Sequence, residues 1–194
     1  MNLEECTLFP YDSEMHESCY PFDCAHKDLN EFFEKDAINY SAELLGKTYC
    51  FTLDKDPQLI VAAFTVSNDS IKTTHLTSGP KTRVTKNIPR VKTMRSYPAV
   101  LIGRLGVNKQ ISRKGIGCEV MDFIKAWFID GKNKTGCRYV VVDAYNEKMP
   151  IDFYTKNGFE LLFSTEQQER EYLKLPTDYP LKTRLMYFDL IILR

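Results

Sequence analysis

A short loop in the middle of the chain has the composition of an anion-binding site. It runs from residue 108 to residue 117, between an apolar run and a helical pattern, and it combines glycines with basic side chains. Glycines let a ligand approach the main chain, and the first amides of a helix have no partners inside the helix. Together with the positive helix end, these groups suit a pyrophosphate. The residues that carry this expectation are Arg113, Lys114, Gly115 and Gly117.

A glycine pair also closes tight turns, so the loop alone leaves a purely structural role open. It lacks the Gly-x-x-x-x-Gly-Lys-Ser/Thr pattern of P-loop proteins and the Gly-x-Gly-x-x-Gly pattern of dinucleotide-binding folds. We therefore expect a different phosphate-bearing ligand.

Charge is distributed unevenly around this loop. Residues 1–69 carry 14 acidic and 4 basic side chains, whereas residues 70–118 carry 11 basic and no acidic ones. A basic block of this length attracts phosphates wherever it reaches the surface. The alternative is that the acidic N-terminal third folds against the block and cancels it.

Hydrophobic periodicity predicts the elements that position the loop. The expected elements are a helix over 26–44, a hairpin of strands 49–53 and 59–66, a buried strand over 99–107, a helix from 116 to about 131, a strand over 139–142, a helix over 150–156 that ends at Asn157-Gly158, and strands over 159–163 and 184–190. This order predicts one mixed α/β domain over residues 1–194, with the 99–107 strand at the centre of the sheet. A basic, irregular insertion with a short helix is expected at about 70–98.

Composition indicates a cytoplasmic protein. The chain has no apolar run of about 18 residues and no signal peptide at its start. The six cysteines form no Cys-x-x-Cys pair, so we expect reduced thiols. A zinc site at His16, Cys19, Cys24 and His26 would have unfamiliar spacing. We expect no metal, no membrane contact, and a monomer or homodimer.

Two motifs in this order resemble the GNAT superfamily of acetyl-coenzyme A dependent N-acetyltransferases. The first is residues 105–107 followed by residues 112–117, set against the family's Gln/Arg-x-x-Gly-x-Gly/Ala, and the second is Phe-Tyr-Thr-Lys-Asn-Gly-Phe at 153–159. The resemblance covers about residues 99–163. It implies a central mixed, mostly antiparallel sheet that is flanked by helices and splayed at the cofactor site.

The resemblance also implies roles for individual residues. The backbone of residues 105–107 would pair with the pantetheine arm of acetyl-coenzyme A, and the amides of residues 113–118 would hold the pyrophosphate. The hydroxyl of Tyr154 would protonate the departing thiolate, unless Tyr154 is an ordinary half-buried aromatic. The residues assigned to cofactor binding are Leu105, Gly106, Val107, Ser112, Arg113, Lys114, Gly115, Ile116, Gly117, Cys118 and Asn146.

Three positions depart from the family pattern. Ser112 stands where the family has Gln or Arg, so the loop must be braced from elsewhere, with Arg113 as one candidate. Asn146 is one residue farther from Tyr154 than the asparagine that usually contacts the pantetheine. The central strand lacks the carboxylate base of many GNAT enzymes. At pH 7, deprotonation of a lysine amine costs roughly 4 to 5 kcal/mol, against about 1 kcal/mol for an α-amine, which is therefore the easier acceptor.

A narrower resemblance concerns the acetyltransferase toxins of bacterial toxin–antitoxin systems. It rests on residues 22–24 and 28–32, and on Tyr97-Pro98-Ala99 before residues 104–107. These toxins acetylate the α-amine of aminoacyl-tRNA and pair with a small DNA-binding antitoxin, so charged tRNA and an antitoxin are the implied partners. The basic block suits tRNA, whereas the zero net charge does not. The alternatives are a protein or small-amine acetyltransferase, and a non-catalytic acyl-coenzyme A sensor or partner-binding module.

Overall fold

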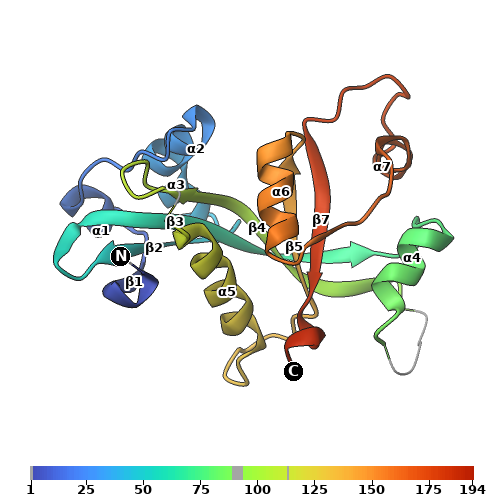
Figure 1. Ribbon diagram of the computed structural model, residues 1–194, viewed down its shortest axis with the longest axis horizontal. Helices are drawn as coiled ribbons and strands as arrows, with labels where there is room; N and C mark the ends of the chain where they lie inside the picture. The colour runs from blue at the N-terminus through green and yellow to red at the C-terminus, as the bar shows by residue number, and fades with distance from the viewer. Residues whose placement is uncertain (1, 89–93, 113) are drawn as a thin grey trace. The chain divides into compact units, whose positions relative to one another are not determined.

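Seven strands form one sheet in the computed structural model, which describes residues 2–88, 94–112 and 114–194. The strands are β1 (Cys6–Pro10), β2 (Lys47–Leu53), β3 (Asp56–Lys72), β4 (Ser96–Val107), β5 (Tyr139–Tyr145), β6 (Glu160–Leu161) and β7 (Thr183–Asp189). Their order is β1-β2-β3-β4-β5-β7-β6, so β4 is central, as predicted (Figure 1). The pairs β1–β2, β2–β3, β5–β7 and β6–β7 are antiparallel. The predicted mostly antiparallel α/β fold is confirmed.

The chain forms two compact units, and the long strands β3 and β4 contribute to both. The helices are α1 (Ser13–Ser18), α2 (Lys27–Glu31), α3 (Ala37–Ala42), α4 (Ser78–Thr85), α5 (Ile116–Ile129), α6 (Lys148–Lys156) and α7 (Glu166–Leu173). The first unit consists of Met1–Ser67 and Ile102–Trp127, and the second of Asn68–Leu101 and Phe128–Arg194. We describe each unit by itself.

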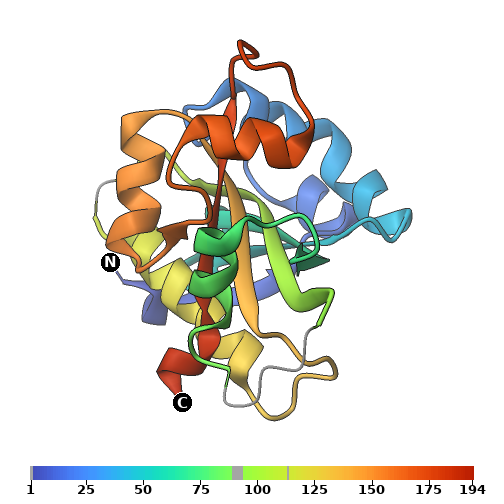
Figure 2. The ribbon, with the colours of Figure 1, turned by 90° about the vertical axis from the view of Figure 1, so that its right-hand side faces the viewer.

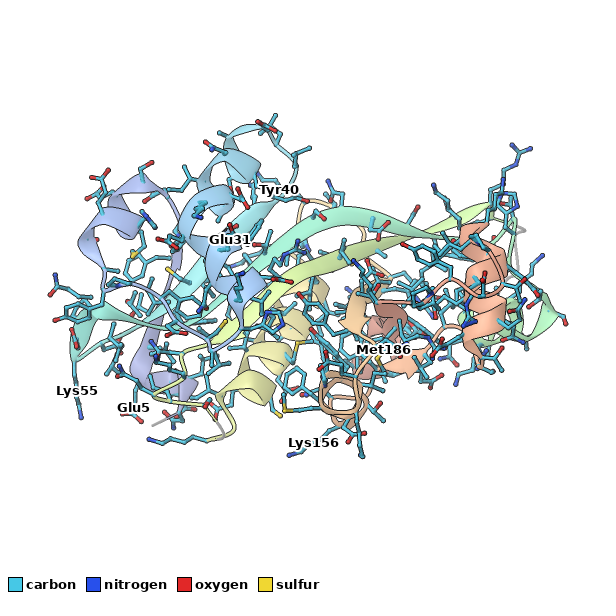
Figure 3. All side chains as sticks on the ribbon, turned by 90° about the horizontal axis from the view of Figure 1, so that it is seen from above. Glu5, Glu31, Tyr40, Lys55, Lys156 and Met186 are labelled. Carbon is cyan, nitrogen blue, oxygen red and sulfur yellow. The ribbon has the colours of Figure 1, made fainter. Side chains whose placement is uncertain are left out.

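In the first unit, helices cover both faces of the strands (Figures 1 and 3). Cys50 of β2 and Ala63 of β3 belong to a core that also contains Phe33, on the side of α1 to α3. The next residue, Phe51, points the other way and contacts Phe123 of α5, with ring centroids 5.1 Å apart. Because successive side chains of a strand alternate between its faces, the two helical layers are held by different residues of the same strands.

The predicted helix at 26–44 is confirmed, but it contains a wide turn. Between α2 and α3, residues Phe32–Asp36 form a π-helical turn, on the segment where Figure 3 labels Glu31 and Tyr40. Two consecutive side chains of this turn are buried, since Phe32 is 8% exposed and Phe33 is 1% exposed. Both aromatic rings therefore belong to the same hydrophobic core.

In the second unit, the strands β5 and β7 also have helices on both faces (Figures 1 and 2). Tyr187 of β7 shares a core with Val84 of α4, and Tyr172 of α7 packs against that core. The next residue, Phe188, contacts Phe159, which follows α6, with ring centroids 5.6 Å apart. The strands thus hold α6 on one side and α4 with α7 on the other.

The segment expected as an irregular insertion at about 70–98 is more ordered than predicted. It contains the end of β3, the helix α4 and the first residues of β4, whereas residues 89–93 lie outside the described chain. Ile71, Leu76, Val84 and Tyr97 enter the core of the second unit. The expected short helix is confirmed as α4, and its surroundings contribute core side chains.

Three elements were not predicted from the sequence. The edge strand β1 is short and only partly buried, and α1 spans six residues, so neither has a long apolar period. The helix α7 has an almost entirely polar sequence. The strand predicted at 159–163 is shorter than expected, because β6 spans only residues 160–161, although the Leu162 amide still donates to the Leu185 carbonyl of β7 at 2.9 Å. Within the described residues, every helix is too short or too polar to cross a bilayer.

Candidate active site

The loop after β4 has the backbone geometry that a glycine permits. Gly115 has a φ of +91°, a left-handed conformation that other residues adopt only with strain. The helix α5 begins at the next residue, Ile116, and its first turn is closed by the Cys118 amide, which donates to the Gly115 carbonyl at 2.8 Å. The amides of Ile116 and Gly117 therefore lead the helix, where an anion would meet them. Arg113 lies outside the described residues.

Asn108 ties the start of this loop to the sheet. Asn108 is buried, with 6% of its surface exposed. Its side-chain nitrogen donates to the Ile60 carbonyl at 3.0 Å, and its side-chain oxygen accepts from the Gln110 amide at 3.0 Å. Ser112 makes a local bond, from its hydroxyl to the Lys109 carbonyl at 3.1 Å. Sequence reasoning missed Asn108, although an asparagine directly after a strand is a known turn signal.

A second brace comes from the acidic N-terminal third of the chain. The Lys109 ammonium lies 2.6 Å from the Asp23 carboxylate, and the Lys109 amide donates to the Asp23 carbonyl at 2.8 Å. Lys109 lowers the pKa of Asp23 to about 2, with help from the Ala25 amide and the Asn30 side chain. The acidic N-terminal third therefore meets the basic block at this point, as the alternative to a free basic surface held, and the contact fixes the loop.

The strand segment 105–107 is backed closely by the N-terminal segment. A Cβ atom on Gly106 would lie 3.1 Å from side-chain atoms of both Phe22 and Cys24. Gly106 is buried, and Leu105 and Val107 are half-buried. A larger residue at position 106 would therefore crowd its neighbours on one face of β4, a packing constraint that the sequence analysis did not predict.

Tyr154 lies in the last turns of α6, and its ring is held by neighbours. Its ring centroid is 5.1 Å from that of Phe153 and 5.5 Å from that of Phe159. Burial raises the pKa of Tyr154 to about 12, and Tyr145 adds to this effect. The phenol is thus protonated at physiological pH, as a proton donor must be. Gly158, with a φ of +82°, ends the helix as predicted.

Asn146 holds the chain that leads into β7. Its side-chain amide donates to the Glu166 carboxylate and to the Leu181 carbonyl, each at 3.0 Å, and its backbone amide donates to the Lys182 carbonyl. These bonds commit the side-chain amide group to α7 and the 174–182 segment. A contact of Asn146 with pantetheine stays a prediction.

The structure groups the predicted site residues within their own units. The first unit contains residues 105–107 and 112–118, and the second contains Asn146 and Tyr154. A cavity of about 300 Å³ in the second unit is lined by parts of 128–138 and 190–194, and none of the predicted residues lines it. In the described chain, His, Cys, Asp and Glu side chains form no group of three or more suited to a metal.

Comparison with known proteins shows the fold. No family model and no curated protein match the chain. A solved structure of a mutant of KacT is 18% identical over 97% of this chain and 96% of its own, with a TM-score of 0.66. A structure of AtaT complexed with acetyl-methionyl-tRNAfMet is 15% identical over 97% of this chain and 96% of its own, also with a TM-score of 0.66. A structure described as a bacterial toxin is 14% identical at the same TM-score. The chain therefore has the fold of these proteins along almost its whole length.

Proposed function

We propose that the protein transfers an acetyl group from acetyl-coenzyme A to a primary amine, and that the α-amine of an aminoacyl-tRNA is its acceptor. The observation that carries the proposal is the braced loop after β4, where Gly115 adopts a left-handed conformation directly before the start of α5. In the proposed function, this loop supplies amides and a helix end for the pyrophosphate of the cofactor. AtaT structures with this fold have been solved with acetyl-coenzyme A and with an antitoxin segment.

The chemistry needs few groups from the protein. The neutral amine attacks the thioester carbonyl, a C–N bond forms, and a backbone amide of residues 105–107 stabilises the oxyanion. The C–S bond then breaks, Tyr154 donates its phenolic proton to the departing thiolate, and the proton released by the amine returns to the phenolate. A phenol with its ordinary pKa near 10 is already protonated at pH 7, and burial raises the pKa of Tyr154 further.

The choice of acceptor follows from the absence of a base in the sequence of the central strand. Residues 96–107 contain no Asp, Glu or His, so the strand itself cannot deprotonate an ammonium group. An α-amine with a pKa near 7.8 reaches its neutral form far more easily than a lysine amine near 10.4. The complex of AtaT with an acetylated aminoacyl-tRNA supports the same class of acceptor. A small antitoxin is the matching protein partner, as in the AtaT–AtaR structures.

Cofactor binding is tested by calorimetric titration of acetyl-coenzyme A into the wild type and into Gly115→Ala. A side chain at this left-handed position costs roughly 1–2 kcal/mol or moves the loop, so we expect affinity to fall about 5- to 30-fold. Gly131→Ala is the control, because a Cβ at Gly131 meets open space and its φ is ordinary. Equal affinity in Gly115→Ala and wild type would show that this loop does not hold the cofactor.

The role of Tyr154 is tested by steady-state kinetics of Tyr154→Phe. Loss of the phenolic proton should lower kcat roughly 100- to 10,000-fold with little change in cofactor affinity. Tyr179→Phe is the matched control, because Tyr179 is an exposed tyrosine of the same unit. Unchanged turnover of Tyr154→Phe would remove the acid role. A wild type that binds acetyl-coenzyme A but transfers no acetyl group would favour the sensor.

A further inference from the structure

Arg104 occupies a distinctive position on the central strand. Its guanidinium carbon lies 5.0 Å above the centroid of the Phe32 ring, and one of its terminal nitrogens donates to the Gly103 carbonyl at 2.7 Å. Phe32 is 8% exposed, whereas Arg104 is exposed. The buried ring therefore supports the guanidinium from below by a cation–π contact and leaves its outer side to solvent.

The helical segment is built to bring this ring to the strand. Within the π-helical turn, Phe32 and Phe33 both belong to the core that contains Tyr11, and Phe32 also packs under Arg104. Both rings are buried within this turn, which departs from regular α-helical geometry. π-Helical turns occur frequently at functional sites.

None of the described carboxylates forms an ion pair with Arg104, although the helical segment 28–36 around Phe32 contains four carboxylates and one lysine. Lys109, five residues along the chain, differs from Arg104 because its ammonium forms an ion pair with Asp23. A planar guanidinium with fixed orientation and no carboxylate partner is suited to a phosphate or carboxylate from a ligand.

Arg104 lies on the face of β4 that is opposite to the helix proposed to hold the cofactor. Arg104 and Gly106 lie two residues apart on one face of β4, the face that contacts Phe32, Phe22 and Cys24. The helix α5, whose start holds the cofactor pyrophosphate in the proposed function, packs on the opposite face of the neighbouring strands. On this face the N-terminal segment covers Gly106 and leaves Arg104 exposed, so an acceptor on the side without the cofactor would meet Arg104.

We propose that Arg104, oriented by Phe32, binds a phosphodiester of the acceptor next to the reactive amine, and so makes a nucleic-acid-linked amine a better substrate than a free one. This rests on the proposed function, which it deepens. Peptides and polyamines lack such a phosphodiester, whereas the aminoacylated end of a tRNA carries one beside the terminal ribose. Arg104 is thus a specificity-determining residue, and it takes no part in proton transfer.

Kinetics on two acceptors test the proposal. One acceptor is charged tRNA, and the other is an aminoacyl-adenosine without a phosphodiester. We expect Arg104→Gln to lower kcat/KM for charged tRNA about 10- to 100-fold, mainly through KM, and to change it less than about twofold for the nucleoside. Arg104→Lys should recover part of the loss, and Phe32→Leu should cause a smaller loss of about two- to fivefold. Arg95→Gln, an exposed charge removed elsewhere, is the control.

Binding separates this proposal from the proposed function. The affinity of a short single-stranded CCA oligonucleotide is measured for wild type and Arg104→Gln at several salt concentrations, which requires no acetyl transfer. Loss of one phosphate contact should reduce the salt slope by about 0.7. An equal fall of kcat/KM on both acceptors, an equal effect of Arg95→Gln, or an unchanged oligonucleotide affinity and slope would each overturn the role of Arg104. Absence of transfer by the wild type to any amine would overturn the proposed function alone.

Discussion

Replacement of Glu169 by glutamine tests the packing of α7 most sharply. Glu169 is 2% exposed and Arg184 is 7% exposed, and the Arg184 Nε lies 2.6 Å from one carboxylate oxygen of Glu169. The other oxygen accepts from the Leu185 amide at 2.6 Å, and a further guanidinium nitrogen donates to the Phe163 carbonyl at 3.0 Å. This buried pair therefore joins α7, β7 and the end of the β6 segment.

The magnitude follows from what the substitution leaves behind. Glu169→Gln removes the negative charge and leaves the Arg184 guanidinium buried without it, which costs about 3–5 kcal/mol. The amide oxygen of glutamine can still accept from the Leu185 amide, so we expect the lower end of this range. For a chain of this size, each kcal/mol lowers the melting temperature by about 2–4 °C, which gives a loss of about 6–12 °C.

The assay is scanning calorimetry on three variants and the wild type. Glu171→Gln, on the exposed side of the same helix, should change the unfolding free energy by less than about 0.5 kcal/mol. The double variant Glu169→Met with Arg184→Met should recover most of the loss, because it removes both charges and fills the space with apolar atoms. A melting temperature of Glu169→Gln within about 2 °C of the wild type would refute this reasoning.

Two further predictions concern the first unit and the buried ionisable groups. Gly106→Ala should destabilise the protein by about 1–3 kcal/mol in urea titrations, because its Cβ would crowd Phe22 and Cys24, while Gly103→Ala on the same strand meets no atom and should cost much less. Equal midpoints for the two variants would contradict this. Burial raises the pKa of Cys50 and of Tyr139 to about 12, so both side chains are protonated in the folded protein. Their contribution to stability is therefore complete below about pH 9 and is lost as the pH rises towards 12. Urea midpoints that stay constant from pH 8 to pH 12 would contradict it, and Cys50→Ala should make the decline shallower.

Most of the elements around the candidate site could be predicted because their sequences have a clear hydrophobic pattern or a clear helix-ending signal. The apolar run of β4, the amphipathic face of α5 and the Asn157-Gly158 ending of α6 each identify a local structure without tertiary information. The helix α7 could not be found in this way, because its anchor is a buried carboxylate whose partner, Arg184, lies 15 residues away. A polar helix that is held by a tertiary ion pair shows no hydrophobic periodicity in its sequence.

The candidate site was predictable in its residue types and less so in its contacts. Gly115 was expected to let a ligand approach the main chain, with a tight turn as the alternative, and its positive φ shows that the chain turns there. Within the described residues the loop is braced by Asn108, whose acceptor is the carbonyl of Ile60, 48 residues earlier, and the brace expected from Arg113 stays a prediction. The π-helical turn that puts Phe32 under Arg104 also depends on packing, because local propensity does not favour it.

The most direct test of the proposed function is a transfer assay with labelled acetyl-coenzyme A. The wild type is incubated with charged tRNA, a peptide and a polyamine in one mixture, and the labelled products are separated and identified by mass. We predict label on the α-amine of the aminoacyl group, with one coenzyme A thiol released for each acetyl group transferred. Label confined to the peptide or the polyamine would contradict the acceptor, and label on none of the three would contradict acetyl transfer itself.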